Sequence, residues 1–295
     1  MRAMMRQTTM PWAGAWTTRV LAIVAFLAAG LVSASAQDTR PCRILVTNDD
    51  GIGAPGIAAL YRSLKDICEV LVVAPAVDRS GTSHSIPDAR QGFAARPVEV
   101  DGDKVGYSVD GTPAEAVALG LIQFGVDRPF DLVVSGIDNG ENTGLANLYS
   151  GTVNAGMEGL VRGVPAIAIS QSGAFGTDYT VAAAFARMLV RRVLKSGLPK
   201  GIMLNVNIPK PATGEVLILP SAGLSLALTG FTATPLAQGG LFYRPNFRPA
   251  AQTGAESDTA MFAGGRITIA PLALDRTAYG ALAALRSWNL SGERP

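Results

Sequence analysis

The chain has 295 residues, with 25 lysines and arginines, 23 aspartates and glutamates, one histidine and two cysteines. Its 48% hydrophobic and 16% charged residues can bury a sizeable core, which fits one large α/β domain or two small ones and excludes a disordered chain or a disulfide-rich scaffold. The net charge of +2 provides no broad basic face, so we expect no binding of nucleic-acid duplexes.

The single histidine, His84, excludes several hydrolase chemistries. One histidine cannot build a multi-histidine zinc or di-iron site. A Ser-His-Asp triad lacks its Gly-x-Ser-x-Gly elbow, and no Cys-x-x-Cys pair is present for thiol redox chemistry. The composition therefore favours a site made of oxygen ligands.

The first 36 residues have the pattern of a secretory signal peptide. Arginines precede an apolar run of about 13 residues at 20–32, and Ala34-Ser35-Ala36 is a small-residue cleavage pattern. The run is shorter than the roughly 20 residues of a membrane helix, although an uncleaved anchor remains the alternative. We therefore expect cleavage after Ala36, a periplasmic or secreted protein spanning 37–295, and no stable membrane span after cleavage.

The mature sequence opens with a strand–helix–strand pattern. Apolar runs at Ile44–Thr47 and Val70–Ala74 predict buried parallel strands, and Ala54–Lys65 has the apolar spacing of a helix between them. Cys42 and Cys68 each stand two residues before a strand. If the strands are parallel neighbours, the two sulfurs could lie side by side, so a disulfide and two free buried thiols both stay open.

Strands and helices continue to alternate along the chain. Thr112-Pro113-Ala114-Glu115 combines an N-cap threonine, a first-turn proline and a capping-box glutamate, and predicts a helix to about Phe124. The other expected elements are β-structure at 97–100 and 105–109, strands at 131–135, 166–170, 203–206 and 266–270, and helices at 151–161, 177–195 and 277–288.

These elements predict one doubly wound α/β domain. Its core covers about 43–210. From 211 to 265 glycine, proline and threonine are frequent and periodicity is poor, which indicates an extended excursion rather than a second core. A strand and a helix at 266–288 then close the domain.

Three polar loops follow three of the predicted strands, at 48–51, 78–83 and 135–140. Ligands bind beyond the carboxyl ends of strands in open parallel sheets, so we expect the loops to meet. Asp49, Asp50, Ser80 and either Asp138 or Asn139 then offer the oxygen ligands that Mg²⁺ or Mn²⁺ prefers. A turn that caps a helix is the alternative for the adjacent aspartates.

A fourth polar stretch, Tyr149-Ser150-Gly151-Thr152, leads into a predicted helix. Hydroxyls and free N–H groups at a helix start form an anion site, so Ser150, Gly151 and Thr152 are candidates to hold a phosphate. An ordinary helix N-cap is the alternative.

Five ordered stretches carry a resemblance to a known family: ILVTNDDGIGAPGIAAL (44–60), VLVVAPAVDRSGTSHSI (70–86), YSVDGTPAEAV (107–117), DLVVSGIDNGENTG (131–144) and YSGTVNAGMEG (149–159). They resemble the SurE family of metal-dependent 5′/3′-nucleotidases, over about 43 to 288. The resemblance implies a Rossmann-like, mostly parallel core with a C-terminal extension that joins subunits in a homodimer or homotetramer.

The resemblance also implies one divalent metal ion per subunit. Its ligands would be Asp49, Asp50, Ser80 and Asp138, where Asp138 replaces the family's asparagine and adds a third negative charge. That charge could tighten metal binding and oppose an incoming phosphate, and Asn139 could be the ligand instead.

The expected activity is hydrolysis of nucleoside 5′- and 3′-monophosphates. Asp49 or Asp50 would orient the attacking water or take its proton. The expected substrate-binding residues are Asn139, Asn142, Ser150, Gly151 and Thr152. His84 is a proton-donor candidate by residue type only, against a loop histidine outside the chemistry. The alternatives are a broad-specificity exported acid phosphatase and a non-catalytic protein that binds a metal or nucleotide.

Overall fold

The computed structural model describes residues 40–86, 91–173, 178–250, 255–288 and 290. The chain divides into two units, 1–40 and 41–295. The expected signal peptide falls in the first unit and lies outside the described residues, so the description concerns the second unit. No helix among the described residues has the length and apolar character needed to cross a membrane.

In the described part of the chain, nine strands form one sheet in the order β3-β4-β2-β1-β5-β6-β7-β11-β8. Neighbours from β4 to β7 are parallel, whereas β3 pairs antiparallel with β4 and β11 with β7. The strands are β1 Arg43–Thr47, β2 Glu69–Pro75, β3 Ala95–Val100, β4 Asp103–Val109, β5 Leu132–Asn139, β6 Ala166–Gln171, β7 Ile202–Ile208, β8 Val216–Ile218 and β11 Ile267–Ala273.

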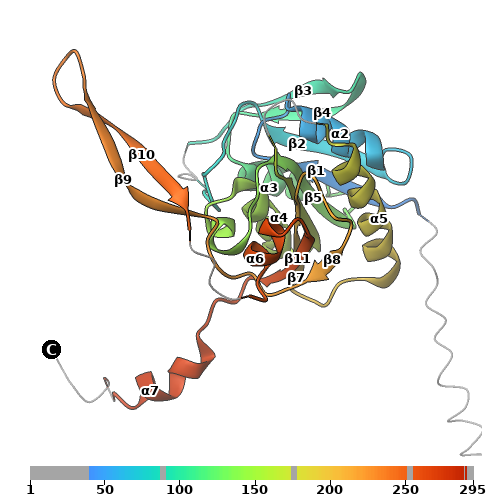
Figure 1. Cartoon of the computed structure of the whole chain (residues 1–295). Coiled ribbons are helices and arrows are strands. Elements are labelled where there is room, and N and C mark those ends of the chain that lie inside the picture. Colours follow the sequence, from blue (N-terminus) through green and yellow to red (C-terminus); the bar gives the residue numbers. More distant parts are fainter. Residues whose placement is uncertain (1–39, 87–90, 174–177, 251–254, 289, 291–295) are drawn as a thin grey trace, which may run out of the picture. The chain divides into compact units, whose positions relative to one another are not determined.

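Helices pack on both faces of this sheet (Figure 1). Helices α2 (Pro55–Leu64) and α5 (Thr180–Ser196) share one hydrophobic cluster with Ile44 and Val46 of β1. Helices α3 (Pro113–Gln123) and α4 (Gly151–Val161) share the other with Leu45. Alternate β1 side chains thus enter opposite cores, because successive residues of a strand point to opposite faces. The predicted doubly wound, mostly parallel fold is confirmed.

Local sequence signals set several helix boundaries. The Thr112 hydroxyl accepts from the Glu115 backbone N–H and the Glu115 carboxylate accepts from Thr112, which is the predicted capping box of α3. Proline stands in the first turn of both α2 and α3. Helix α5 begins at Thr180, and its expected first residue, Thr177, lies outside the described residues.

Strand β5 is longer than the sequence predicts. It continues to Asn139, so most of the expected loop at 135–140 is strand, with a bulge between Gly136 and Asp138. Gly136 has φ 134°, and a Cβ there would lie 2.3 Å from the Ile169 carbonyl oxygen. Only glycine fits this conformation and this close approach, and the bulge sets the register in which Asp138 faces β6.

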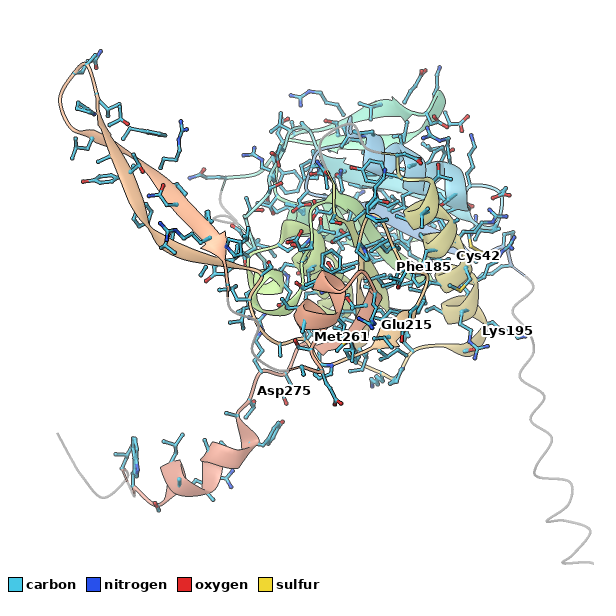
Figure 2. All side chains as sticks on the ribbon, viewed as in Figure 1. Cys42, Phe185, Lys195, Glu215, Met261 and Asp275 are labelled. Atoms are coloured by element: carbon cyan, nitrogen blue, oxygen red, sulfur yellow. A yellow bond between two sulfur atoms is a disulfide. The ribbon has the colours of Figure 1, made fainter. Side chains whose placement is uncertain are left out.

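The C-terminal part differs most from the prediction. The stretch expected to be irregular contains β8, an antiparallel hairpin of β9 (Leu226–Pro235) and β10 (Leu241–Pro249), and helix α6 (Asp258–Ala263). The expected closing helix at 277–288 is present but shorter: a 3₁₀ turn, η2 (Tyr279–Ala281), precedes a short α7 (Leu282–Arg286). Most side chains of the hairpin and of α7 are exposed (Figure 2).

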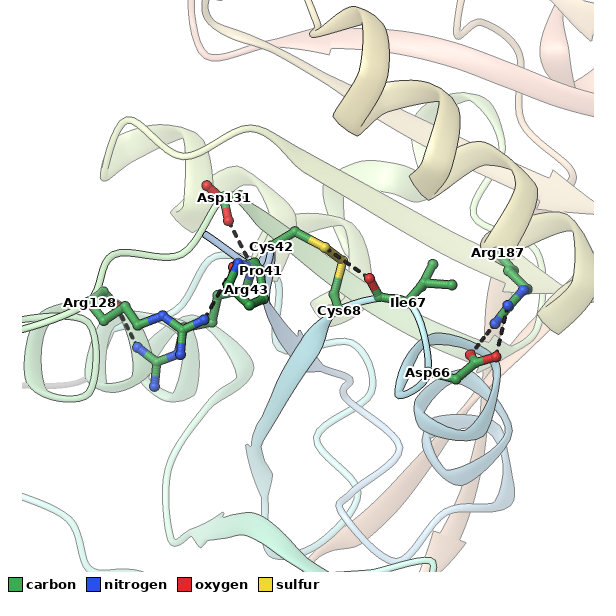
Figure 3. The surroundings of a disulfide bond; sticks show 9 residues. All are labelled: Pro41, Cys42, Arg43, Asp66, Ile67, Cys68, Arg128, Asp131 and Arg187. Carbon is green, nitrogen blue, oxygen red and sulfur yellow. Dashed lines mark hydrogen bonds and ion pairs between the residues drawn. A yellow bond between two sulfur atoms is a disulfide. The ribbon is translucent and has the colours of Figure 1, made fainter. Parts of the chain in front are cut away.

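The two cysteines form a disulfide (Figure 3). Strands β1 and β2 are parallel neighbours with Arg43 paired to Glu69, so Cys42 and Cys68 stand just ahead of this pair with Cα atoms 4.9 Å apart. The sequence left both a disulfide and two free thiols open, and the register of the two strands explains why the disulfide forms.

Candidate active site

The candidate site lies where the strand order reverses. Strand β1 stands between β2 and β5, and the chain passes from β1 to β2 through α2 and later enters β5 after α3, on the opposite face. Such a switch point opens a crevice at the carboxyl ends of the strands. Asp49 and Asp50 follow β1 and Asp138 stands near the end of β5, and oxygens of all three carboxylates lie within 4.8 Å of one another.

Asp49 is enclosed by the start of α4. Its side chain accepts hydrogen bonds from the hydroxyl and backbone N–H of Thr152, and the residue is only 2% exposed. A Cβ on Gly151 would lie 2.7 Å from Asp49 Oδ2, so the absence of a side chain there lets the helix start approach the carboxylate. Burial raises the pKa of Asp49, although the Thr152 hydrogen bonds oppose the rise.

The other two carboxylates are also unfavourably placed for negative charge. Burial and then the charge of Asp49 raise the pKa of Asp50 to about 6. Burial, followed by the charges of Asp49 and Asp50, raises the pKa of Asp138 well above its ordinary value. The charged form of such a cluster needs a cation, and buried Asn139 Oδ1 has no partner among the described residues. The donor set is entirely oxygen and fits a hard divalent ion.

The loop after β2 is hydrogen-bonded to the segments that carry this cluster, so these polar loops meet as predicted. The Arg79 backbone N–H donates to the Asp49 carbonyl at 2.7 Å, and the Ser83 N–H donates to the Tyr149 carbonyl at 3.1 Å. Ser80, one residue beyond Arg79, is exposed, and its backbone N–H donates to Asp78. Sequence reasoning missed Asp78, whose charge contributes to raising the pKa of both Asp49 and Asp50.

Two predicted phosphate ligands are engaged within the protein. The Ser150 hydroxyl caps α4 by accepting from the Val153 N–H at 3.1 Å, so the N-cap alternative holds for Ser150. The Thr152 hydroxyl donates to Asp49. What this helix start offers an anion is its positive dipole end beside the acid cluster.

Asn139 and Asn142 lie against the same cluster. The Asn139 backbone N–H donates to Asp50 Oδ2 at 3.3 Å. Asn142 donates through Nδ2 to Asp138 Oδ2 at 2.6 Å and to Ser170 Oγ at 2.8 Å. Asn139 therefore contacts Asp50 through its backbone, whereas Asn142 contacts Asp138 through its side-chain amide.

An open cavity of about 700 Å³ adjoins the acid cluster. Its lining includes Asn142, which donates to Asp138, and Ser150, which caps α4. One wall is the 3₁₀ helix η1 (Gly144–Leu148), and the other comes from the segment before β9 and from the base of the hairpin. Glu141 is the only charged residue that the described part of the chain contributes to its lining. Its apolar side chains are Leu145, Ala146, Leu148, Tyr149, Leu224, Leu226, Leu228 and Phe247. Sequence reasoning missed this cavity, because its walls are far apart in the chain.

His84 contacts the middle of α4. Its Nε2 lies 2.9 Å from Glu158 Oε2, and Arg162 Nε donates to Glu158 Oε1 at 2.7 Å. Burial alone would raise the pKa of Glu158, but these two contacts outweigh burial and lower it. The contact connects the Ser80 loop to α4, which agrees with the alternative of a histidine outside the chemistry.

The family model described as "Survival protein SurE" matches residues 44–226. The chain belongs to the SurE family. Relatives named 5'-nucleotidase SurE are 40% identical in Geobacter sulfurreducens, over 85% of this chain and 95% of the relative, and 37% identical in Rhodopirellula baltica, over 84% and 99%. A crystal structure of the SurE protein from Aquifex aeolicus is similar with a TM-score of 0.72 at 32% identity, covering 83% of this chain and 99% of that one.

The match to the SurE family model contains every predicted site residue and ends at Leu226, where β9 begins. The hairpin residues of the cavity wall, Leu228 and Phe247, lie beyond it. The part of the chain that the family model matches thus carries the acid cluster and the start of α4, and residues after it contribute to the cavity wall.

Proposed function

We propose that this SurE-family chain hydrolyses nucleoside 5′- and 3′-monophosphates to nucleoside and phosphate, using one divalent cation per subunit, Mg²⁺ or Mn²⁺. One observation carries the proposal: three carboxylates converge at the start of α4, beside an apolar cavity. The relatives named 5'-nucleotidase support the reaction class.

Asp49, Asp50 and Asp138, with Ser80 from the neighbouring loop, would hold the cation. When bound, the cation supplies positive charge that polarises the phosphoryl group. Asp50 is the more exposed of the first two acids, and its carboxylate would orient the attacking water and accept its proton. The positive end of α4 stabilises the charge that develops on the phosphoryl oxygens.

The cavity would receive the nucleoside. Its volume falls in the range of small-molecule sites, and its lining offers aromatic and aliphatic side chains for a base. Among the described residues, the lining contains no lysine or arginine to neutralise further phosphates, and it carries the acidic Glu141. A nucleoside with a single phosphate matches this chemistry better than a nucleoside triphosphate or polyphosphate, which weighs against the broad-specificity alternative.

We also propose that the protein is exported and oligomeric. The signal-peptide pattern at 1–36 and the disulfide both suit an oxidising compartment. The hairpin exposes large apolar side chains, among them Phe231, Leu241, Phe242 and Tyr243, which suit contact with another subunit in a homodimer or homotetramer.

The test is phosphate release from 5′- and 3′-mononucleotides by the chain from Gln37, with EDTA, Mg²⁺ or Mn²⁺. Asp49→Asn removes one charge from the cluster at nearly constant volume. The matched control is Asp101→Asn, a surface acid paired with Arg62. We expect metal-dependent release that Asp49→Asn abolishes and the control retains. A folded protein that binds Mn²⁺ but releases no phosphate would contradict hydrolysis and favour the non-catalytic alternative, for which the third carboxylate, Asp138, is the supporting feature. Glycerol phosphate and polyphosphate as substrates test the preference for nucleosides.

A further inference from the structure

A row of buried polar side chains crosses the sheet away from the acid cluster. Register pairs Asp138 of β5 with Ser170 of β6, Ser170 with Asn207 of β7, and Asn207 with Thr268 of β11. Ser170, Asn207 and Thr268 are fully buried and Asp138 is 9% exposed. Polar groups this deep are costly unless they are bonded, so the arrangement of their partners is informative.

Asn142 is bonded to three of the four strands in this row. Its backbone N–H donates to Asn207 Oδ1 at 2.7 Å, and Asn205 Nδ2, from the same strand, donates to its carbonyl oxygen at 2.8 Å. The two asparagines are two residues apart in β7 and therefore share one face of the strand. The backbone of Asn142 is thus held from both its donor and its acceptor side.

The side-chain amide of Asn142 has a fixed orientation. An amide nitrogen carries two hydrogens, and Nδ2 donates both, one to Asp138 Oδ2 and one to Ser170 Oγ. The reverse orientation would place an acceptor oxygen against the Asp138 carboxylate, which is repulsive. The side chain of Asn142 therefore has no N–H left to donate, and its remaining Oδ1 acceptor is a poor partner for a phosphate oxygen.

We propose that Asn207 is a positioning residue: it fixes the backbone of Asn142, and the Asn142 amide in turn fixes the Asp138 carboxylate toward the cation. This inference rests on the proposed metal site and deepens it. It assigns Asn142 to Asp138 rather than to the substrate phosphate, and it gives the β7 asparagines a role although neither is adjacent to the acids in sequence.

Mn²⁺ binding to the purified protein without substrate, followed by electron paramagnetic resonance, tests this chain of contacts. Asn207→Leu removes the acceptor for Asn142. The matched control is Thr268→Val, at the next position of the same row, because buried Thr268 Oγ1 has no partner among the described residues. Partners outside the ligand set usually change metal affinity about 10- to 100-fold. We expect Asn207→Leu to weaken Mn²⁺ binding at least about ten-fold and Thr268→Val to leave it unchanged. Both variants should melt cooperatively.

Asn142→Ala keeps the test decisive if Asn207→Leu does not fold. If Asn142 positions Asp138, this variant should bind Mn²⁺ more weakly in the absence of substrate, and its kcat should recover at high metal concentration. If Asn142 instead contacts the substrate phosphate, the variant should bind Mn²⁺ as the wild type does and should have a raised KM. Mn²⁺ affinity within two-fold of wild type in Asn207→Leu and Asn142→Ala, or an equal loss in Thr268→Val, would overturn the inference. Weakened Mn²⁺ binding in a protein that hydrolyses no nucleotide would instead reject the proposed activity and leave the positioning role standing.

Discussion

The disulfide between Cys42 and Cys68 should account for a measurable part of the stability. It joins the residue ahead of β1 to the residue ahead of β2, and between those strands four register pairs hold the native geometry without it. We therefore expect reduction to leave the native fold in place and to act mainly on the unfolded chain, which gains conformational freedom when the cross-link is lost.

The magnitude follows from the loop that the disulfide closes. The cysteines are 26 residues apart in sequence. The chain-entropy relation for a loop of that length gives about 3.5 kcal/mol at 25 °C. For a domain of this size, 1 kcal/mol shifts the melting temperature by roughly 2–4 °C, so reduction should lower it by about 7–14 °C.

Urea unfolding of oxidised and reduced protein measures this difference without changing the composition of the chain. Circular dichroism is the suitable signal, because Trp288, the single tryptophan after residue 36, is exposed. The variant Cys42→Ala/Cys68→Ala is the control and should not respond to reductant. A change below about 1 kcal/mol on reduction, or an equal response of the double variant, would refute this account of the disulfide.

Two further predictions concern the site. Gly151→Ala should lower kcat/KM about 100-fold in a folded protein, because a Cβ there would lie 2.7 Å from Asp49 Oδ2 and must displace that carboxylate; unchanged kinetics would contradict the close approach. Phe247→Ala should raise KM for AMP by roughly 5- to 100-fold, the usual range for losing one base–aromatic contact, and leave KM for glycerol phosphate unchanged. Phe93→Ala, an exposed aromatic residue outside both the hairpin and the cavity lining, is its control and should match wild type on both substrates.

Much of the core was predictable because its signals are local. Continuous apolar runs such as Val70–Ala74 indicate buried parallel strands, and the Thr112 capping box indicates where α3 starts. The meeting of the polar loops also followed from local signals, since parallel strands bring their carboxyl ends to one edge of the sheet. The acid cluster was accessible to the same argument because Asp49 and Asp50 adjoin a strand end.

Other features depend on partners distant in sequence. The Ser135-Gly136 pair is typical of a loop, yet β5 continues through it because β6 supplies hydrogen bonds on the far side of a bulge. The hairpin has proline and glycine at several positions and no one-sided hydrophobic pattern, so its strands are defined mainly by pairing with each other. The asparagines of β7 lie in MLNVNIP (203–209), which echoes the family only weakly, and no local pattern indicated their role, because it depends on a register set by two neighbouring strands.

The three clustered carboxylates lead to a prediction about how the stability of the metal-free protein depends on pH. The pKa of Asp50 is raised to about 6 and that of Asp138 is raised well above its ordinary value, so the metal-free native protein binds more protons near pH 5–6 than the unfolded chain does. Stability therefore decreases as pH rises through about 6, because the native state holds the excess protons.

Melting temperatures in EDTA should be higher at pH 5.5 than at pH 7.5, and Asp138→Asn should make this difference smaller. Saturating Mn²⁺ should reverse the trend, because the cation binds the deprotonated acids and stabilises the state that holds it. A metal-free melting temperature that rises from pH 5.5 to 7.5, or that responds identically in Asp138→Asn, would mean that the three acids do not share one buried site.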